Sequence, residues 1–118
     1  MLGNLGSKSV YLALGPTDMR KSIDSLAALV QVTFALDPFS EGLFVFCNRQ
    51  KDRMKILQWN YNGFWLHYRR LERGRFQWPD KSEALVAEVD YRQLRWLLDG
   101  LALGQPRAHK EVKQRTIV

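Results

Sequence analysis

The dipeptide Asn62-Gly63 separates two runs that are rich in aromatic and large apolar side chains, residues 53–61 and residues 64–71. Asn and Gly best tolerate the positive φ that both central residues of a type I′ turn require, so the pattern predicts a β-hairpin. A two-residue turn also sets the register of the paired strands. The predicted pairs are Tyr61–Phe64, Trp59–Leu66, Leu57–Tyr68 and Lys55–Arg70. The chain is therefore expected to be organised around an antiparallel sheet.

An earlier hairpin is expected just before this one. Residues 49–52 are polar or charged and follow the apolar run at residues 43–47, so they predict a four-residue loop. The pairs expected there are Phe44–Leu57 and Phe46–Lys55. Three strands with one hydrophobic face can be stable in water, whereas a single hairpin is marginal.

Side chains alternate along these strands and so separate into two faces. The aromatic face, which is expected to form the core, carries Phe44, Phe46, Leu57, Trp59, Tyr61, Phe64, Leu66 and Tyr68. The other face mixes Cys47, Met54 and Ile56 with Gln58, Trp65 and His67, and is expected to be partly covered and partly wet. A fourth short strand is predicted at residues 76–78, where Pro79 ends it.

A strand and a helix are expected before the sheet segment. Residues 10–14 are β-prone and predict a strand that joins the sheet. Thr17 is a plausible N-cap, and apolar residues follow at helical spacing from Met19 to Phe34. The helix should end near Ala35, because the residue before a proline, here Pro38, avoids the α region.

A short strand or connector and a second helix are expected after the sheet segment. Residues 84–89 are apolar enough for the strand. Asp90 and Gln93 have the spacing of a capping box, and Gly100 suits a helix C-terminus.

Together these elements predict an α+β fold: a small antiparallel β meander of about four to five strands, packed with an N-terminal helix and a short C-terminal helix. We expect residues 1–103 to form a single domain. Residues 104–118 are basic and lack periodicity, so they predict a C-terminal tail that is mobile or that a partner orders.

The net charge is concentrated in one segment. Residues 43–79 hold eight of the 18 Lys and Arg residues but two of the 12 acidic ones, so they account for the whole net charge of +6. The same segment holds nine of the 14 aromatic residues. A sheet core explains the aromatic residues but not the charge excess. A basic chain of this kind suggests a polyanionic partner, nucleic acid first and a membrane surface second, and solubility alone is the alternative.

The candidate contacts for such a partner are basic side chains in three groups. One group lies at a turn of the meander, a second at the far end of the next strand, and a third in the first turn of the N-terminal helix. The residues are Arg49, Lys51, Arg53 and Lys55; Arg69, Arg70, Arg73 and Arg75; and Arg20 and Lys21. The predicted register places Arg53 opposite Glu72 and Lys55 opposite Arg70. The second pair sets like charges opposite each other, which folding does not explain, whereas a polyanionic partner does. Cations at a helix start form an anion site with the free N–H groups, or are simply solvated.

Several other chemistries are disfavoured. The single cysteine, Cys47, allows no internal disulfide and leaves no cysteine cluster for zinc. The acidic residues are scattered, so no pair of metal ions is expected. Cys47 and His67 share a face but lack an orienting partner, so the cysteine is expected to be buried and the histidine hydrogen-bonded. We therefore expect no enzyme activity and no cofactor. No apolar run approaches the length of a membrane span, and the N-terminus has no signal-peptide pattern, so a cytoplasmic protein is expected.

Several motifs occur together along the chain: GPTDMRKS, DPF, LFVF, DRMKIL, GFWL and RRLERGRF. Over residues 10–101 the sequence resembles the small accessory protein of the insertion sequence 66 family of bacterial transposons, often called TnpB or Orf2-like. The last seventeen residues lie outside this resemblance. It implies a role in transposition beside a separate transposase and a second accessory protein, with no known catalytic residues or cofactor.

Two functions are compatible with these observations. The first is an accessory protein that binds DNA, mainly through phosphates, in which Trp65 beside His67 and Arg69 stacks on unpaired bases or packs in the fold. The second is a protein-interaction module that holds the transposase or another copy of itself. For that module the predicted contact is Leu97, Leu98 and Leu101, provided the C-terminal helix exposes them.

Overall fold

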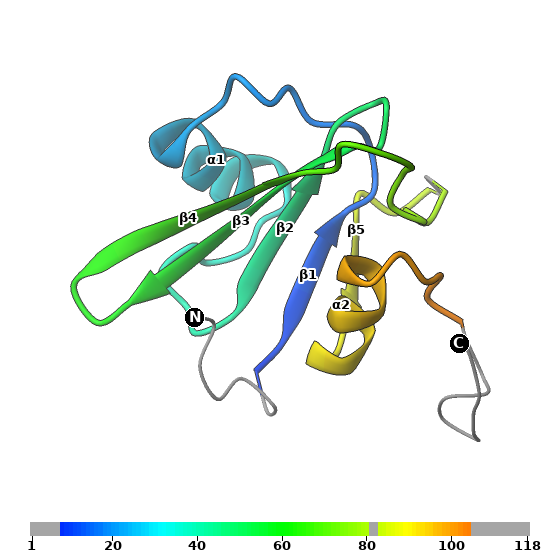
Figure 1. The fold of residues 1–118 in the computed structure, drawn as a ribbon. Helices are drawn as coiled ribbons and strands as arrows, with labels where there is room; N and C mark the ends of the chain where they lie inside the picture. The colour runs from blue at the N-terminus through cyan, green and yellow to red at the C-terminus, as the bar shows by residue number, and fades with distance from the viewer. Residues whose placement is uncertain (1–7, 81–82, 105–118) are drawn as a thin grey trace.

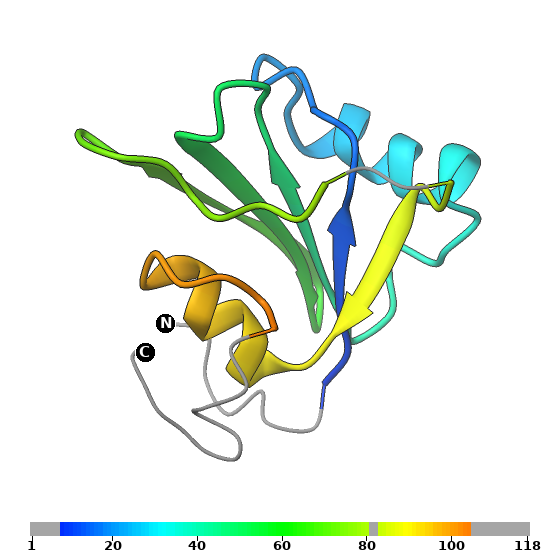
Figure 2. The ribbon, with the colours of Figure 1, turned by 90° about the vertical axis from the view of Figure 1, so that its right-hand side faces the viewer.

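The computed structural model describes residues 8–80 and 83–104, which form a five-stranded sheet with a helical segment on each face (Figure 1; Figure 2). The elements in chain order are β1 (Val10–Ala13), α1 (Ile23–Ala28), η1 (Leu29–Thr33), β2 (Leu43–Cys47), β3 (Arg53–Asn60), β4 (Gly63–Arg70), β5 (Val86–Val89) and α2 (Tyr91–Leu98). η1 is a π-helical turn that continues α1. Of the helices in the described residues, none combines the length and the apolar character that a bilayer crossing requires.

The predicted α+β fold is confirmed, with one difference in strand direction. The strand order is β4-β3-β2-β1-β5. β2, β3 and β4 form the expected antiparallel meander, and β5 is antiparallel to β1. β1 is parallel to β2, because the segment that contains α1 and η1 supplies the crossover that a parallel pair needs. The sheet is therefore mixed, not purely antiparallel.

Helices cover both faces of the central strands, so the sheet has two cores (Figure 2). The core on the aromatic face contains Leu26, Val30, Phe44, Phe46 and Leu57. The core under α2 contains Leu43, Val45, Cys47, Met54, Ile56, Phe76, Trp78, Leu94 and Leu97. The expectation of a mixed second face thus holds only towards β4, where Trp65 is 57% exposed. β2 lies between the two cores and is buried along its whole length.

The register of the β3–β4 hairpin differs by two residues from the prediction. Tyr61 and Asn62 form the turn, in place of Asn62 and Gly63, and Tyr61 takes the positive φ of 63°. The observed pairs are Trp59–Phe64, Leu57–Leu66, Lys55–Tyr68 and Arg53–Arg70. Because the shift is an even number, every side chain keeps its predicted face. The earlier hairpin has the predicted pairs Phe44–Leu57 and Phe46–Lys55.

Aromatic packing accounts for this register. The ring centroids of Trp59 and Phe64 lie 4.9 Å apart, and Phe39 packs on both at 5.0 and 5.4 Å. Each aromatic pair contributes about 0.5–1.5 kcal/mol beyond its buried area. Three pairs together can offset a strained φ at Tyr61, which costs about 1–3 kcal/mol.

The N-terminal helix begins later than predicted. α1 starts at Ile23, and Ser22 occupies the N-cap position without a capping side-chain bond. Thr17 is not the N-cap, because its N–H donates to the carbonyl of Cys47 at 2.8 Å and so ties the preceding loop to the end of β2. Arg20 and Lys21 therefore lie in a loop before the helix, not in its first turn. The end near Ala35 is confirmed, since that residue has a φ of 56°.

The C-terminal elements largely follow the prediction. β5 pairs with β1, and α2 has the expected capping box, with the Gln93 N–H donating to Asp90 at 2.7 Å and the Asp90 N–H donating to the Gln93 side chain at 3.0 Å. Gly100 ends the helical region with a φ of 83°. The predicted strand at residues 76–78 is wrong: Phe76 and Trp78 pack in the core under α2, and the Trp78 indole donates to the carbonyl of Ala13 at 3.0 Å. Most of the predicted tail, residues 105–118, lies outside the described residues.

Candidate nucleic-acid interface

The topology brings all ten predicted contact residues to one end of the sheet. β1 and β2 end there, β3 begins there and β4 ends there. The segments at this end are residues 14–22, 48–53 and 69–79, at the top of Figure 1. We call their basic side chains the basic rim: Arg20, Lys21, Arg49, Lys51, Arg53, Arg69, Arg70, Arg73 and Arg75. Lys55 lies at the same end but points inward, as described below.

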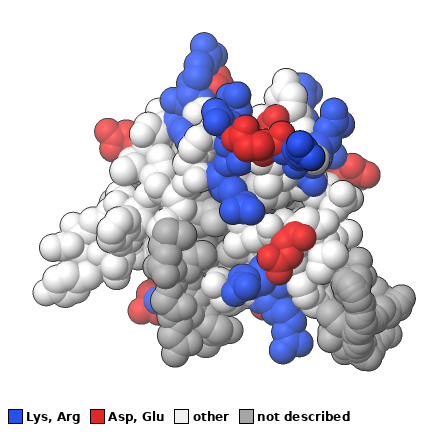
Figure 3. Space-filling model, in the orientation of Figure 1, with Lys and Arg blue, Asp and Glu red and all other residues white. Residues whose placement is uncertain are grey.

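The distribution of charge is visible on the surface. Figure 3 shows blue basic side chains gathered over the loops at the top, with red acidic groups among them and a smaller blue group lower down near α2. The tip of the β3–β4 hairpin, at the left of the same view, is white. In this view the basic side chains are therefore concentrated at one end of the sheet and absent from the hairpin tip.

Backbone hydrogen bonds hold the three rim segments together. The Leu71 N–H donates to the carbonyl of Asp52 at 2.8 Å, and the Phe76 N–H donates to the carbonyl of Lys51 at 2.7 Å. With the bond from Thr17 to Cys47, these contacts fix all three loops to the sheet. The basic side chains are therefore attached to an ordered backbone.

The loop between β2 and β3 is folded around Asn48. Its side-chain oxygen accepts the N–H groups of Asp52 and Arg53, both at 3.0 Å, and its amide nitrogen donates to the Asp52 carboxylate at 2.7 Å. Lys51 has a φ of 64° in this turn. Sequence reasoning missed the role of Asn48, although asparagine is a common residue for such side-chain-to-backbone bonds in turns.

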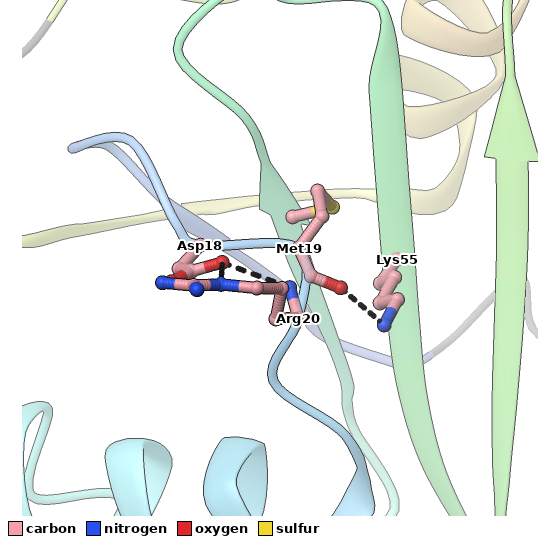
Figure 4. Close-up of polar contacts among 4 residues, drawn as sticks. All are labelled: Asp18, Met19, Arg20 and Lys55. Carbon is pink, nitrogen blue, oxygen red and sulfur yellow. Dashed lines mark hydrogen bonds and ion pairs between the residues drawn. The ribbon is translucent and has the colours of Figure 1, made fainter.

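Three rim cations have a carboxylate partner. The Arg20 guanidinium forms two short bonds to Asp18, at 2.7 and 3.0 Å (Figure 4). This bonding lowers the pKa of Asp18 to about 2 and raises the pKa of Arg20. Arg70 bonds Glu72 at 2.9 Å, which raises the pKa of Arg70, and Lys51 lies 4.0 Å from Asp80.

Lys55 has a structural role. Its ammonium group donates to the carbonyls of Met19 and Lys21, both at 2.7 Å, and lies 5.7 Å from the centre of the Tyr68 ring. Figure 4 shows the ammonium turned towards the loop that carries Met19. These two bonds attach the loop before α1 to β3. The group that sequence reasoning assigned to a polyanion thus already has partners.

Six rim cations remain without a carboxylate within 4.0 Å in the described part of the chain. They are Lys21, Arg49, Arg53, Arg69, Arg73 and Arg75. The predicted like-charge pair of Lys55 and Arg70 is wrong, and so is the pairing of Arg53 with Glu72; because the register shifts, Arg53 lies opposite Arg70 instead. Like charges on paired strands are unfavourable, and the ion pair of Arg70 with Glu72 offsets part of this repulsion.

A hollow of about 540 Å³ lies between the first two rim segments and β4. Its lining includes Thr17, Asp18, Arg20, Asn48, Arg49, Gln50, Arg53 and Tyr68. Three guanidinium groups thus face one space, and its lining carboxylate, Asp18, is already bound to Arg20. An anion such as a phosphate fits this combination, because guanidinium groups bind phosphate oxygens in pairs.

Other chemistry finds little support among the described residues. Burial raises the pKa of the Cys47 thiol to about 12, so the thiolate is scarce near neutral pH. His67 hydrogen-bonds the Gln58 side chain at 3.2 Å, and burial lowers its pKa. No group of three or more His, Cys, Asp and Glu residues that could hold a metal occurs in the described ranges. The protein contact was predicted on the condition that the C-terminal helix exposes Leu97, Leu98 and Leu101; Leu97 is fully buried, and Leu98 and Leu101 are half-buried.

The fold and this surface define a class: a small α+β protein with helices on both faces of its sheet and an arginine-rich surface at the strand ends. Within that class the chain belongs to the IS66 Orf2-like family, whose model, described as IS66 Orf2 like protein, matches residues 8–108. The match includes residues 102–108, which had been expected to lie outside the resemblance. The family is not known as catalytic, and membership suggests an accessory role in IS66 transposition.

Two similar proteins come from Sinorhizobium fredii (strain NBRC 101917 / NGR234). The uncharacterized protein y4hO is 38% identical over 98 residues, which cover 83% of this chain and 84% of that protein. The uncharacterized protein y4jC is 32% identical over 106 residues, which cover 80% of this chain and 91% of that protein. No solved structure matches the chain.

Proposed function

We propose that this protein is a non-catalytic accessory factor in transposition that binds DNA through the basic rim. The observation that supports this most is the convergence of three separate segments, which place six cations without carboxylate partners at one end of the sheet. Because the helices cover the centre of the sheet, DNA binding uses the strand ends and not the aromatic face.

The rim contacts are mainly with phosphates. Arginine predominates among them, and phosphate contacts set position and affinity but carry little sequence information. The protein therefore binds DNA with weak sequence preference on its own. The cognate transposase and the second accessory protein of the element are its partners, and they supply target choice and catalysis.

Salt dependence tests this proposal. If about five or six cations meet phosphates, log K falls with log salt at a slope of roughly −0.9 per contact. Replacing Arg69, Arg70, Arg73 and Arg75 together with Glu abolishes binding while the fold persists. A matched pair of single variants serves as control: Arg49→Glu weakens binding, and Arg92→Glu, the same change on α2 away from the rim, does not. A slope near zero, or equal losses from the two single variants, would reject the proposal.

A second candidate function is favoured by exposed aromatic residues at and beside the tip of the β3–β4 hairpin. There Phe39 is 54% exposed beside the rings of Trp59 and Phe64, and Tyr61 is 90% exposed. Aromatic residues are enriched at protein interfaces. In this alternative the protein assembles or regulates the transposase complex. The test is co-purification with the transposase after nuclease treatment, with Phe39→Ser and Tyr61→Ser expected to abolish it.

A further inference from the structure

A pair of parallel rings lies on the outer strand of the sheet, on the face towards α2. The centroids of Trp65 and His67 are 6.1 Å apart, with an angle of 11° between the ring planes. The Gln58 side chain fixes the histidine ring through its hydrogen bond. Trp65 has been expected to pack or to stack on bases, and its 57% exposure leaves most of its ring surface open. This pair is an ordered aromatic platform at the edge of the protein.

A groove begins beside this platform and runs towards the basic rim. Its first part, about 340 Å³, is lined by Met54, Ile56, His67, Tyr68, Arg69, Arg95, Leu98 and Asp99. A second hollow of about 450 Å³ shares Arg69, Leu98 and Asp99 with the first and adds Leu71, Arg73, Gly74, Arg75 and Gly100. The two hollows are therefore neighbours that share one wall, and both are lined by apolar side chains and guanidinium groups.

The charges of the groove select an anionic occupant. Arg69 and Arg95 flank its first part, Arg73 and Arg75 line its second, and the one acidic residue in the lining of either part is Asp99. An occupant that is only anionic would leave the half-buried Leu98 side chain and the exposed Trp65 ring unused. A chain that alternates phosphates with flat apolar rings uses all of them.

We propose that this groove holds an unpaired segment of DNA, with a base stacked on the Trp65–His67 platform and the flanking phosphates bound by Arg69 and Arg95. The inference rests on DNA binding by the basic rim and adds the form of the DNA, single strand or opened duplex. In a duplex the base faces are stacked on one another, so an exposed protein ring reaches them only where pairing is broken. The rim then holds the backbone that leaves the groove.

Tryptophan fluorescence tests the proposal directly. The other tryptophans are buried or half-buried, and Trp59 lies on the opposite face of the sheet, so Trp65 is the one most open to a ligand. A single-stranded oligo(dT) of roughly 16 nucleotides, near the upper site size of one small binding fold, is titrated into the full chain. It should quench the fluorescence of wild-type protein and of Trp59→Phe, and fail to quench Trp65→Leu.

The affinities should follow the same pattern. Trp65→Leu should bind oligo(dT) roughly 5- to 150-fold more weakly, the effect of losing one stacked base. An abasic strand of equal length keeps the phosphates, so it should bind wild-type protein and Trp65→Leu equally. Arg95→Gln should weaken binding of oligo(dT) while leaving Trp65 and the rim intact, which covers the case in which Trp65→Leu does not fold.

The outcomes separate this inference from the proposed function. If duplex DNA of the same length binds as tightly as oligo(dT) and Trp65→Leu changes neither, the inference is overturned while binding by the rim stands. The same holds if poly-glutamate quenches Trp65 as oligo(dT) does, since the groove would then take an acidic peptide. If no form of DNA binds, both fail.

Discussion

Replacing Lys55 with Met should destabilise the fold far more than it weakens DNA binding. The ammonium group makes two hydrogen bonds of 2.7 Å to the carbonyls of Met19 and Lys21, and lies near the Tyr68 ring. A hydrogen bond to a charged group contributes about 1.5–3 kcal/mol. Both bonds share one half-buried ammonium, so we expect a loss of about 2–3 kcal/mol in the free energy of unfolding, less than the sum.

The matched control is Arg53→Met, two residues earlier on the same face of β3. Arg53 is exposed and faces Arg70, so its removal should change stability by less than about 0.5 kcal/mol or raise it slightly. The salt dependence of DNA binding should behave in the opposite way. Arg53→Met should reduce the slope by about 0.9, whereas Lys55→Met should leave it unchanged.

Denaturant titration measures the free energy of unfolding, provided that the dependence on denaturant concentration is the same in all variants. A mobility shift assay at several salt concentrations measures the salt dependence of DNA binding. If Lys55→Met proves as stable as wild-type protein and reduces the salt slope as Arg53→Met does, then Lys55 is a phosphate ligand. The structural role assigned to it would then be refuted.

Three further predictions concern the rim, the second helix and the core. Bonding to Arg20 holds the pKa of Asp18 at about 2, against 3.8 unperturbed, so the stabilising contribution of Asp18 is present above pH 3.8 and is lost as the pH falls towards 2. The thermal midpoint of wild-type protein should therefore exceed that of Asp18→Asn at about pH 5, and the two midpoints should converge near pH 2. A difference that persists at low pH would contradict the assignment. Asp90→Ala removes the acceptor of the capping box with Gln93 and should cost about 0.5–2 kcal/mol in denaturant unfolding, and no change would show that the cap is dispensable. The Cys47 thiol, buried and with its pKa raised to about 12, should react with a thiol reagent in denaturant but not in native buffer, and rapid reaction in native buffer would disprove its burial.

Local patterns in the sequence predicted those features that depend on residues close together in the chain. The capping box of α2 and the Phe44–Leu57 pairing are of this kind, because each is set by a turn or a cap within a few residues. The register of the β3–β4 hairpin is not. Phe39, some twenty residues earlier, packs on its rings and competes with the turn preference of Asn62-Gly63.

The candidate site was predictable in composition but not in detail. The charge excess of residues 43–79 indicated which segment is basic, and the antiparallel pairing placed two of its clusters at one end. Arg20 lies at the same end as these two clusters because β1 pairs in parallel with β2, and no local pattern in the sequence predicts that pairing. Lys55 donates its hydrogen bonds to two carbonyls that lie more than thirty residues away in the sequence, so its structural role was not predictable locally.

The burial of β2 on both faces has a consequence for how this protein can diversify. Modules such as the RNA recognition motif leave one sheet face open and read their ligand across it. Here the helices cover the central strands, so the centre of the sheet is not open to a ligand in this way. Loops at strand ends accept substitution and changes of length more readily than strands do. The loops at the strand ends can therefore change in sequence and length while the three-layer scaffold stays the same.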